Sequence, residues 1–308
     1  MRRTSSIMKP KRIMKADPAA SVVLRLLRSF LDANEPELIK VLVSFWRNQG
    51  KAITYKEIRE AILSGDIDPA LLEAWQQDYT RFVVTHLQPA WRTAIETAAS
   101  EIAAKYPEWY FNPMAEGVRN WTDTRAAEFV TSVTDTQIEG IRAVVQNAAA
   151  LNNLNVDQLA RVIRPMVSLT KQQSIANLKY YENLIANGVK EKRALDLSLR
   201  YSARQHRYRG MLIARSELAY AYNRGAYEAA KQAQEKGYMG ECVKVWITAD
   251  DERTCPTCSA LDGEIIGLDD EFNFKTKLTM PGIKLTPPLH PSCRCGFQIK
   301  EIAPPNKK

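Results

Sequence analysis

The 308-residue sequence has no cysteine before Cys242 and only three histidines: His86, His206 and His290. It contains no run of 18 or more apolar residues, which argues against a membrane-spanning helix and a membrane partner. The stretch from Met1 to Lys15 is basic but lacks the apolar segment of a secretory signal peptide. We therefore expect synthesis in a reducing cytoplasm and a flexible basic arm over residues 1–16.

Positive charge is in excess over negative charge. The chain has 43 Lys and Arg against 35 Asp and Glu, a formal net charge of +8, while 45% of its residues are hydrophobic. This hydrophobic content is sufficient for a packed core. The positive charge favours a polyanionic partner such as nucleic acid, although a surplus of Lys and Arg also serves solubility alone.

Four of the five cysteines lie within 41 residues near the C-terminus, as Cys255-Pro-Thr-Cys258 and His290-Pro-Ser-Cys293-Arg-Cys295. Thiolates and an imidazole at such spacing are typical ligands of tetrahedral zinc. The pattern offers five ligands for four places, so one of His290, Cys293 and Cys295 is spare. Because the ligands can close the shell, we expect the zinc to be structural, with no open catalytic position.

Two other interpretations of the cysteines stay open at this point. A pair of disulfides requires an oxidising compartment, and the Cys-x-Cys pair cannot easily bridge itself. Plain reduced thiols are the second alternative. A zinc would join two segments that are separated by residues 259–289, a stretch rich in Gly, Pro and Asp and poor in residues suited to a core.

The chain before residue 240 reads as a succession of helices. Capping residues, prolines and apolar periodicity predict them from residue 17 to about 33, 34–50, 54–65, 68 onward with a kink or break at Pro89, 122–151, 155–165, 169–187 and 189–236, the last of these with a possible break near Arg209 and Gly210.

After Gly240 the sequence pattern changes from helical periodicity to alternation. Residues 242–248 alternate and are rich in β-branched side chains, which predicts a strand with short partners at residues 265–266 and 297–299. The expected fold is mainly α: an elongated helical N-terminal region followed by a small α+β, zinc-stapled C-terminal domain. The expected divisions are the arm, a helical region over 17–200, the zinc domain over 201–300 and a flexible tail over 301–308.

One helical stretch is strongly basic. Between Lys190 and Arg215 there are eight Lys or Arg and two acids. Arg200, Arg204 and Arg207 recur on one helix face, and with Arg209 they are our candidate DNA-binding residues. Contacts of this kind bind phosphates without regard to sequence. The alternative is that the face meets an acidic protein surface.

The order of motifs in the C-terminal third resembles the phage head-morphogenesis or minor capsid family, whose members carry a Mu F-like domain. The residues that carry the resemblance are Arg215-Ser-Glu217 to Asn223 on a helix, Val245-Trp246-Ile-Thr248 with Asp250 and Asp251, the Cys255 to Cys258 pair, Leu261-Asp262-Gly263-Glu264, and Pro-Pro-Leu-His290-Pro291-Ser-Cys293-Arg294-Cys295. It is specific over residues 210–299 and weaker upstream through residue 169.

This resemblance implies a virion protein made in the bacterial host cytoplasm and located inside the capsid near the portal. Expected partners are the portal protein, the capsid or scaffold interior, and double-stranded DNA bound non-specifically. The implied role is to assist procapsid assembly and DNA packaging or delivery, and such proteins are not known as enzymes.

Two enzyme classes compete with that interpretation. A zinc-supported nuclease of HNH type needs a general-base histidine beside a second metal ligand, and His290 is the one histidine near the cysteines. A thiol oxidoreductase places its Cys-x-x-Cys pair at the start of a helix in a βαβ setting, whereas a Gly-containing turn follows Cys258 at once.

Overall fold

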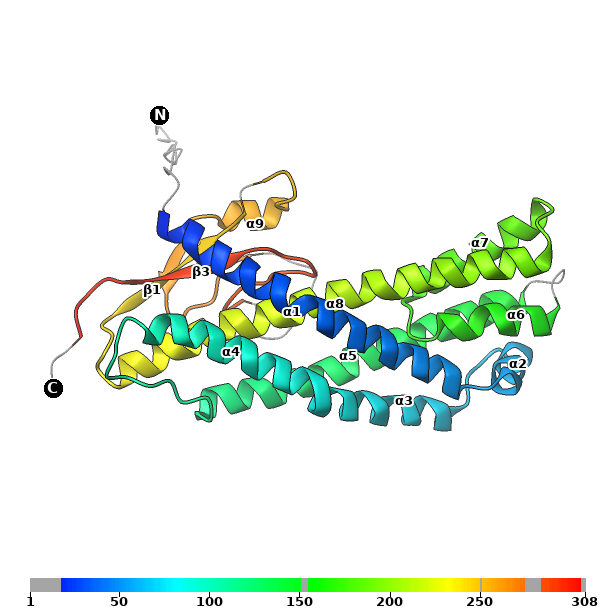
Figure 1. The fold of residues 1–308 in the computed structure, drawn as a ribbon, viewed down its shortest axis with the longest axis horizontal. Coiled ribbons are helices and arrows are strands. Elements are labelled where there is room, and N and C mark those ends of the chain that lie inside the picture. Colours follow the sequence, from blue (N-terminus) through cyan, green and yellow to red (C-terminus); the bar gives the residue numbers. More distant parts are fainter. Residues whose placement is uncertain (1–17, 151–154, 250, 275–283, 306–308) are drawn as a thin grey trace, which may run out of the picture.

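The computed structural model describes residues 18–150, 155–249, 251–274 and 284–305. The predicted arm and Asp250 lie outside these residues, as do the last three residues of the tail. The described chain forms a long helical bundle with a small sheet at one end (Figure 1). The longest helix, α8 (Glu191–Glu235), has 45 residues. At 1.5 Å per residue it extends for about 67 Å and runs through most of the bundle.

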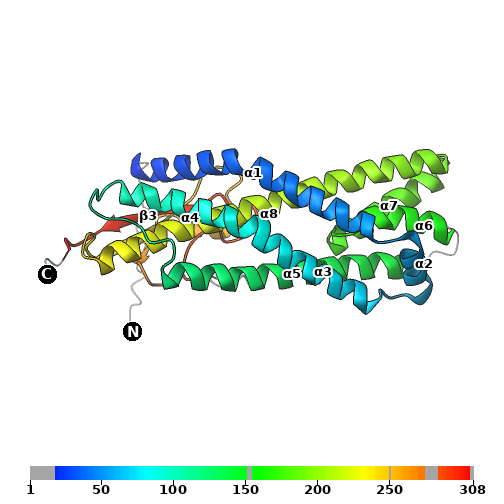
Figure 2. The same cartoon turned by 60° about the horizontal axis from the view of Figure 1, so that its bottom comes forward.

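The first helix, α1 (Pro18–Ala52), occupies the place of two predicted helices. Pro36 lies inside it and removes one backbone hydrogen bond. The apolar face nevertheless continues through this point, with Leu31, Leu38 and Leu42 all buried. Packing on both sides of the proline therefore keeps one helix, which changes direction about midway along its length (Figure 2). The predicted division at residue 34 is wrong.

Helices α2 to α7 build the rest of the bundle. Their bounds are α2 Tyr55–Ser64, α3 Pro69–Phe82, α4 Gln88–Ala103, α5 Glu116–Ala149, α6 Val156–Ile163 and α7 Lys171–Ala186. Sequence signals marked several of these ends. Thr54 and Glu57 form the predicted capping box of α2, and Gly65 ends it in a left-handed conformation.

The predicted kink at Pro89 takes a specific form. A π-helical turn, Val83–Leu87, connects α3 to α4, and Pro89 lies in the first turn of α4. The backbone N–H of Gln88 donates to the Val83 carbonyl oxygen across this turn, so helical hydrogen bonding continues up to the residue before the proline. A break therefore does not occur, and the chain continues as helix through the junction.

Helix α8 is continuous through Gly210, so the possible break there does not occur. Its C-terminal half packs closely on α4. A Cβ atom added to Gly225 would lie 2.4 Å from the carbonyl oxygen of Ile95. Glycine is thus required at this crossing for the two backbones to approach.

The hydrophobic core is divided along the bundle. The central part combines side chains of α1, α3, α4, α5 and α8, including Trp46, Tyr79 and Trp91. A second part lies at the far end, where α2, α6 and α7 pack around Ile58 and Ile163. The bundle is therefore held together along its whole length.

The sheet has three antiparallel strands in the order β2-β1-β3, with β1 Cys242–Ile247, β2 Ile265–Gly267 and β3 Gly296–Glu301. All three predicted strands are confirmed. Trp246 pairs with Phe297 across β1 and β3, and Val245 pairs with Ile265 across β1 and β2. A short helix, α9 (Pro256–Leu261), lies between β1 and β2.

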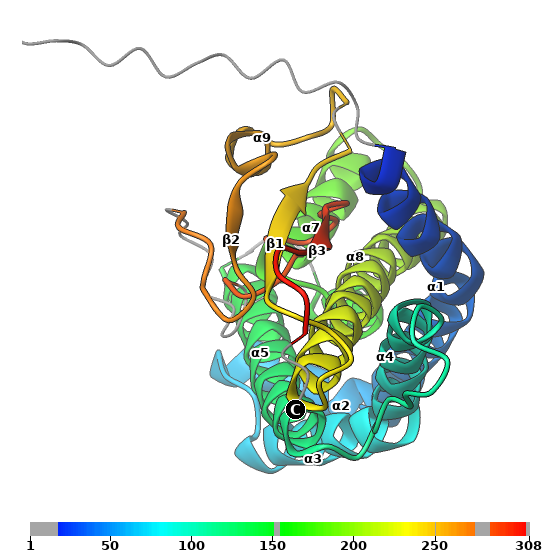
Figure 3. The ribbon, with the colours of Figure 1, turned by 90° about the vertical axis from the view of Figure 1, so that its left-hand side faces the viewer.

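The sheet and α9 lie beside one end of α1 and α8 (Figure 3). The position of Gly296 shows the contact with α1, since a Cβ there would be 3.4 Å from side-chain atoms of Val23 and Leu24. The predicted fold class, mainly helical with a small C-terminal α+β part, is confirmed. Helix α8 passes through residue 200 without interruption, and the placement of domain boundaries stays a prediction.

Candidate metal centre

The cysteine pair of α9 is prepared for a ligand by the local backbone. Cys255 is the N-cap of the helix, and its sulfur accepts a hydrogen bond from the backbone N–H of Cys258 at 3.3 Å. Pro256 occupies the first helical position, where its fixed φ suits helix entry. Both sulfurs therefore lie at the start of one helix, on the side of the second ligand segment.

The second segment brings its candidate ligands to the same place. Cys255, Cys258 and His290 form one group, and Cys258, Cys293 and Cys295 form another, with ligand atoms within 4.8 Å of one another in each group. Cys258 is common to both. All five sequence-predicted metal residues are thus brought together, although they are separated by up to 40 positions in the chain.

Two distances from Cys258 match a tetrahedral shell. Its sulfur lies 3.8 Å from the Cys293 sulfur and 3.5 Å from Nε2 of His290. Zinc–sulfur bonds of about 2.3 Å at tetrahedral angles separate two sulfurs by about 3.8 Å. A disulfide needs about 2.05 Å between sulfurs, and all five cysteines are free.

His290 is oriented for metal binding through Nε2. Its Nδ1 lies 2.9 Å from the Pro291 carbonyl oxygen, so Nδ1 carries the proton and donates it. Metal-bound histidines generally donate their second ring N–H in this way, which fixes the tautomer. Burial by itself lowers the pKa of His290. The hydrogen bond to Pro291 and the nearby sulfurs of Cys293 and Cys255 have the larger effect, so the pKa is raised overall.

The three buried thiols are close enough that ionisation of one changes the pKa of its neighbours. Contacts with Cys293 and Cys295, together with burial, raise the pKa of Cys258, whereas the hydrogen bond from Cys258 lowers the pKa of Cys293. The sulfurs of Cys258, Cys293 and Cys295 are almost fully inaccessible to solvent. A divalent cation among them would remove the repulsion between thiolates, so the donor set fits a metal such as zinc.

The space between the ligands is small. A hollow of about 20 Å³ is lined by the five candidate ligands together with Thr254 and Arg294. This is close to the volume that a single water needs, so the hollow has room for one ion. The geometry therefore suits a structural ion. Which four of the five ligands would hold it stays open.

Comparison with known families is informative over this part of the chain. Residues 149–298 match the family model for Phage Mu protein F like protein. Over these residues the chain belongs to the Mu F-like family. The Mu F-like segment begins at the end of α5, includes α6, α7, α8 and the five candidate metal ligands, and so reaches further upstream than the resemblance indicated. No curated protein and no solved structure matches the chain.

The family is one of phage head morphogenesis, which makes this a capsid-related, virion-associated protein. It is a structural family, consistent with the expected absence of enzymatic activity. No helix within the described ranges is long and apolar enough to cross a membrane.

The Mu F-like motif on α8 has a role that its sequence did not reveal. Arg215 makes two hydrogen bonds to Glu35 of α1, and Glu217 pairs with Arg125 of α5. The residue between them, Ser216, faces the metal segment, where its oxygen accepts a hydrogen bond from the Ser292 backbone N–H at 3.2 Å. Three successive residues of α8 thus hold α1, α5 and the ligand loop.

The four candidate DNA-binding arginines separate into two groups. Arg200, Arg204 and Arg207 are exposed on α8. Arg200 pairs with exposed Asp196, and Arg204 lies over the ring of Tyr201. Arg209 differs from the expectation, since it is only 5% exposed and its guanidinium lies over Trp46 in the bundle interior. Two helical positions after Arg207, the side chain points inward and is not available to a phosphate.

Proposed function

We propose that this chain is a minor head protein that works by attachment inside the capsid, near the portal. The helical bundle and the zinc-stapled end form two contact surfaces, one toward the portal protein and one toward the capsid or scaffold interior and the packaged DNA. Its role is to assist procapsid assembly and DNA packaging or delivery. The observation that supports the proposal is that the Mu F-like segment contains a cluster of five candidate metal donors at one end of the bundle.

The metal in this proposal is zinc with a structural role. Cys255, Cys258 and His290 would hold it together with one or both of Cys293 and Cys295. When bound, zinc supplies a cross-link between α9 and the segment before β3. The Asp251 carboxylate supports that segment by accepting hydrogen bonds from two guanidinium nitrogens of Arg294, and Ser292 ties it to α8.

Non-specific DNA contact is proposed for Arg200, Arg204 and Arg207. They follow one exposed face of α8, and each released counterion would contribute to a salt-dependent affinity. Duplex of arbitrary sequence should bind, with a steep loss of affinity between about 50 and 200 mM salt. Replacing all three arginines with alanine should reduce the salt slope by roughly one unit per lost contact.

The matched control removes the same charge elsewhere. Arg92, Lys105 and Arg119 are exposed on or near α4 and α5, and their replacement by alanine should leave the salt slope close to that of the original protein. Equal effects of the two triple variants would show that net charge, not the α8 face, governs binding. Sequence-selective binding that ignores salt would contradict the proposal as a whole.

The location is tested in particles. Mass spectrometry of purified procapsids and mature heads should detect the protein, and immobilised portal protein should retain it. Density for the bundle should lie inside the shell in a map of the head. Absence from both kinds of particle, together with no retention by portal at low salt, would reject the head assignment and reopen the enzyme alternatives.

The alternative is a zinc-supported DNA-processing enzyme of HNH nuclease type. Among the described residues, the clustered metal donors include one histidine, His290, which the proposed shell would use. Incubation of the purified protein with supercoiled plasmid and magnesium distinguishes the two functions. Cleavage that is lost in a His290→Ala variant would favour the nuclease.

A further inference from the structure

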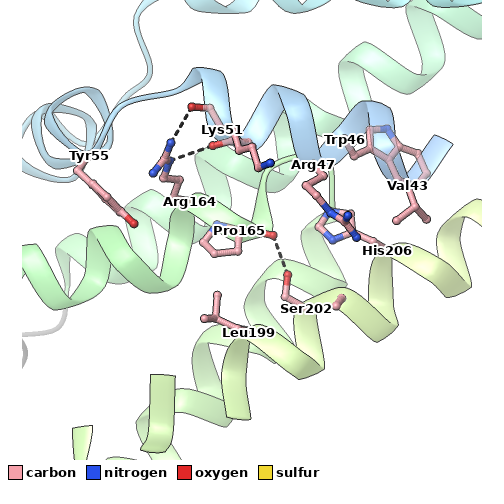
Figure 4. Close-up of a pocket in the computed structure, with 12 residues that line it drawn as sticks. Val43, Trp46, Arg47, Lys51, Tyr55, Arg164, Pro165, Leu199, Ser202 and His206 are labelled. Carbon is pink, nitrogen blue, oxygen red and sulfur yellow. Dashed lines mark hydrogen bonds between the residues drawn. The ribbon is translucent and has the colours of Figure 1, made fainter. Parts of the chain in front are cut away.

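A pocket of about 240 Å³ opens far from the metal centre, between the end of α1, the α6–α7 connection and α8. Its apolar wall is formed by Val43, Pro165, Leu199 and Ala203. Arg47, Lys51 and Arg164 lie along the α1 side, opposite Leu199 and Ser202 of α8 (Figure 4). Pockets that hold drug-sized ligands have volumes of about 300–1,000 Å³, so this one suits a single side chain.

The charge around this pocket has one sign. None of its lining residues is acidic. Within the part of the chain that the structure describes, Arg47 and Lys51 have no carboxylate partner. Arg164 donates to the carbonyl oxygens of Gly50 and Lys51 and lies over Tyr55, and it too lacks an acidic partner. The three charges are therefore available to an anionic ligand.

The exposed arginine row of α8 continues this charge. Arg200, Arg204 and Arg207 each directly follow a residue that lines the pocket, namely Leu199, Ala203 and His206. Successive residues of a helix are separated by about 100° around its axis. The row therefore lies about a quarter turn around α8 from the residues that line the pocket. Cations thus lie on the α1 side of the hollow and along the neighbouring face of α8.

Two uncharged polar side chains of the pocket lining are already hydrogen-bonded. Ser202 donates to the Pro165 carbonyl oxygen, and Nε2 of His206 is bonded to the Val167 carbonyl oxygen. Burial lowers the pKa of His206 to about 4, so it is neutral at physiological pH. The Trp46 ring is 1% exposed. A nucleobase binds without sequence preference by stacking on an open aromatic face. Here the Trp46 ring is buried and Arg164 covers one face of the exposed Tyr55 ring, so the pocket offers little stacking surface.

We propose that this pocket is the docking site for an acidic peptide segment of a partner protein, anchored by one apolar side chain. The anchor would occupy the wall between Leu199 and Val43, and flanking carboxylates would meet the cations on the α1 side and on the neighbouring face of α8. The basic N-terminal arm of this same chain carries the wrong charge for that place. The proposal goes beyond the head assignment and does not depend on the metal.

The experiment uses the full-length protein and dye-labelled synthetic octapeptides. Each has glutamate and aspartate flanks of constant charge and differs in one central residue, either leucine, phenylalanine or alanine. Fluorescence anisotropy should give at least about tenfold tighter binding for the leucine or phenylalanine peptide than for the alanine peptide, because the anchor buries apolar surface. Equal affinity of the three peptides, or binding of none, would overturn the proposal.

Variants locate the binding site. Ala203 is an exposed helical residue at the pocket wall, so Ala203→Trp should fill the hollow and abolish the preference for an apolar anchor. Ala127→Trp on α5, also exposed, is the control and should have no effect. Arg47→Glu with Lys51→Glu should weaken all three peptides, whereas Arg92→Glu with Lys105→Glu should weaken them much less.

A DNA probe separates the two uses of this surface. A 20-base-pair duplex should bind Ala203→Trp and the original protein alike, because phosphate contact does not need the hollow. If Ala203→Trp instead weakens the duplex and leaves the peptides unchanged, the pocket belongs to nucleic acid and the peptide proposal is wrong. If the α8 triple variant loses duplex binding and still prefers the peptides with an apolar anchor, that result would support the peptide site independently of the DNA contacts.

Discussion

Ser216 in the middle of α8 accepts a hydrogen bond from the backbone N–H of Ser292, which lies between the candidate metal ligands His290 and Cys293. Ser292 has a φ of 60°, so the ligand loop turns sharply at the residue that contacts the helix. The ligand segment is thereby positioned against the bundle as well as against α9. The candidate metal site and α8 are therefore physically connected through one short loop.

The metal prediction is tested by Cys258→Ser, since Cys258 belongs to both ligand groups. Elemental analysis of protein purified under reducing conditions should find one zinc per chain, and the variant should lose it. Structural zinc in small modules contributes on the order of 10 kcal/mol to folding. Residues 240–300 should then become sensitive to limited proteolysis while circular dichroism still reports the helical bundle.

Cys242→Ser is the matched control for that experiment. Cys242 is buried in β1 apart from the metal ligands, and burial with nearby Glu301 and Glu241 raises its pKa to about 11. Its thiol is therefore protonated at neutral pH and is a poor ligand. This variant should keep its zinc. A metal-free original protein with all five thiols titratable would disprove the metal site.

The buried ion pair between α5 and α8 should be important for stability. Arg125 and Glu217 make two hydrogen bonds, and both side chains are less than 10% exposed. Glu217→Ala leaves the guanidinium buried beside Glu128 alone, which typically costs about 3–5 kcal/mol. Urea unfolding measures the loss.

Glu37→Ala, in the exposed pair with Lys40, is the control and should change the free energy of unfolding by at most about 1 kcal/mol. If both variants unfold at the same urea concentration, the Arg125–Glu217 pair does not stabilise the bundle as its burial implies.

The candidate metal ligands can be predicted from the sequence because their chemistry depends on residue type and local spacing. Cys255 and Cys258 occupy one helical turn, and His290 to Cys295 occupy one loop, so each half is a local pattern. The partners of Arg215 and Glu217 were not visible in this way. Glu217 meets Arg125 across 92 positions, and no local signal marks a contact at that separation.

Burial of single residues on long helices was equally difficult to predict. Arg207 and Arg209 differ by two positions, yet one is exposed and the other is 5% exposed. The direction in which each side chain points depends on where α1 crosses α8, a tertiary fact. Pro36 illustrates the same limit, because a proline normally marks a helix start, whereas packing on both sides keeps α1 continuous.

Two glycines on α8 should respond to alanine in opposite directions. Gly225→Ala would place a Cβ 2.4 Å from the Ile95 carbonyl oxygen, so α4 and α8 would have to separate. Overpacking of this kind costs about 1–3 kcal/mol. The nearest atoms to a Cβ on Gly210 are 3.6 Å away, and Gly210→Ala should stabilise the helix by roughly 0.5–1 kcal/mol. Thermal unfolding of the two variants, measured side by side, tests the predicted signs.

Lys244 is fully buried on the central strand of the sheet. Its ammonium donates to the Leu268 carbonyl oxygen at 2.8 Å and lies over the rings of Tyr227 and Phe272. Burial lowers the pKa of Lys244 to about 8, although the nearby carboxylates of Asp269 and Asp270 act in the opposite direction.

The sign of the resulting pH dependence follows from proton binding. Between pH 8 and about 10.5 the unfolded chain keeps the lysine proton while the folded chain loses it, so the free energy of unfolding rises with pH. The slope attributable to this residue is at most about 1.4 kcal/mol per pH unit, and the total is of the order of 3 kcal/mol. Lys244→Met removes the titration. The free energy of unfolding of Lys244→Met minus that of the original protein should therefore fall, by up to about 3 kcal/mol, as the pH rises from 8 to 10.5. A difference that stays constant over this range would show that Lys244 titrates alike in the folded and unfolded chains.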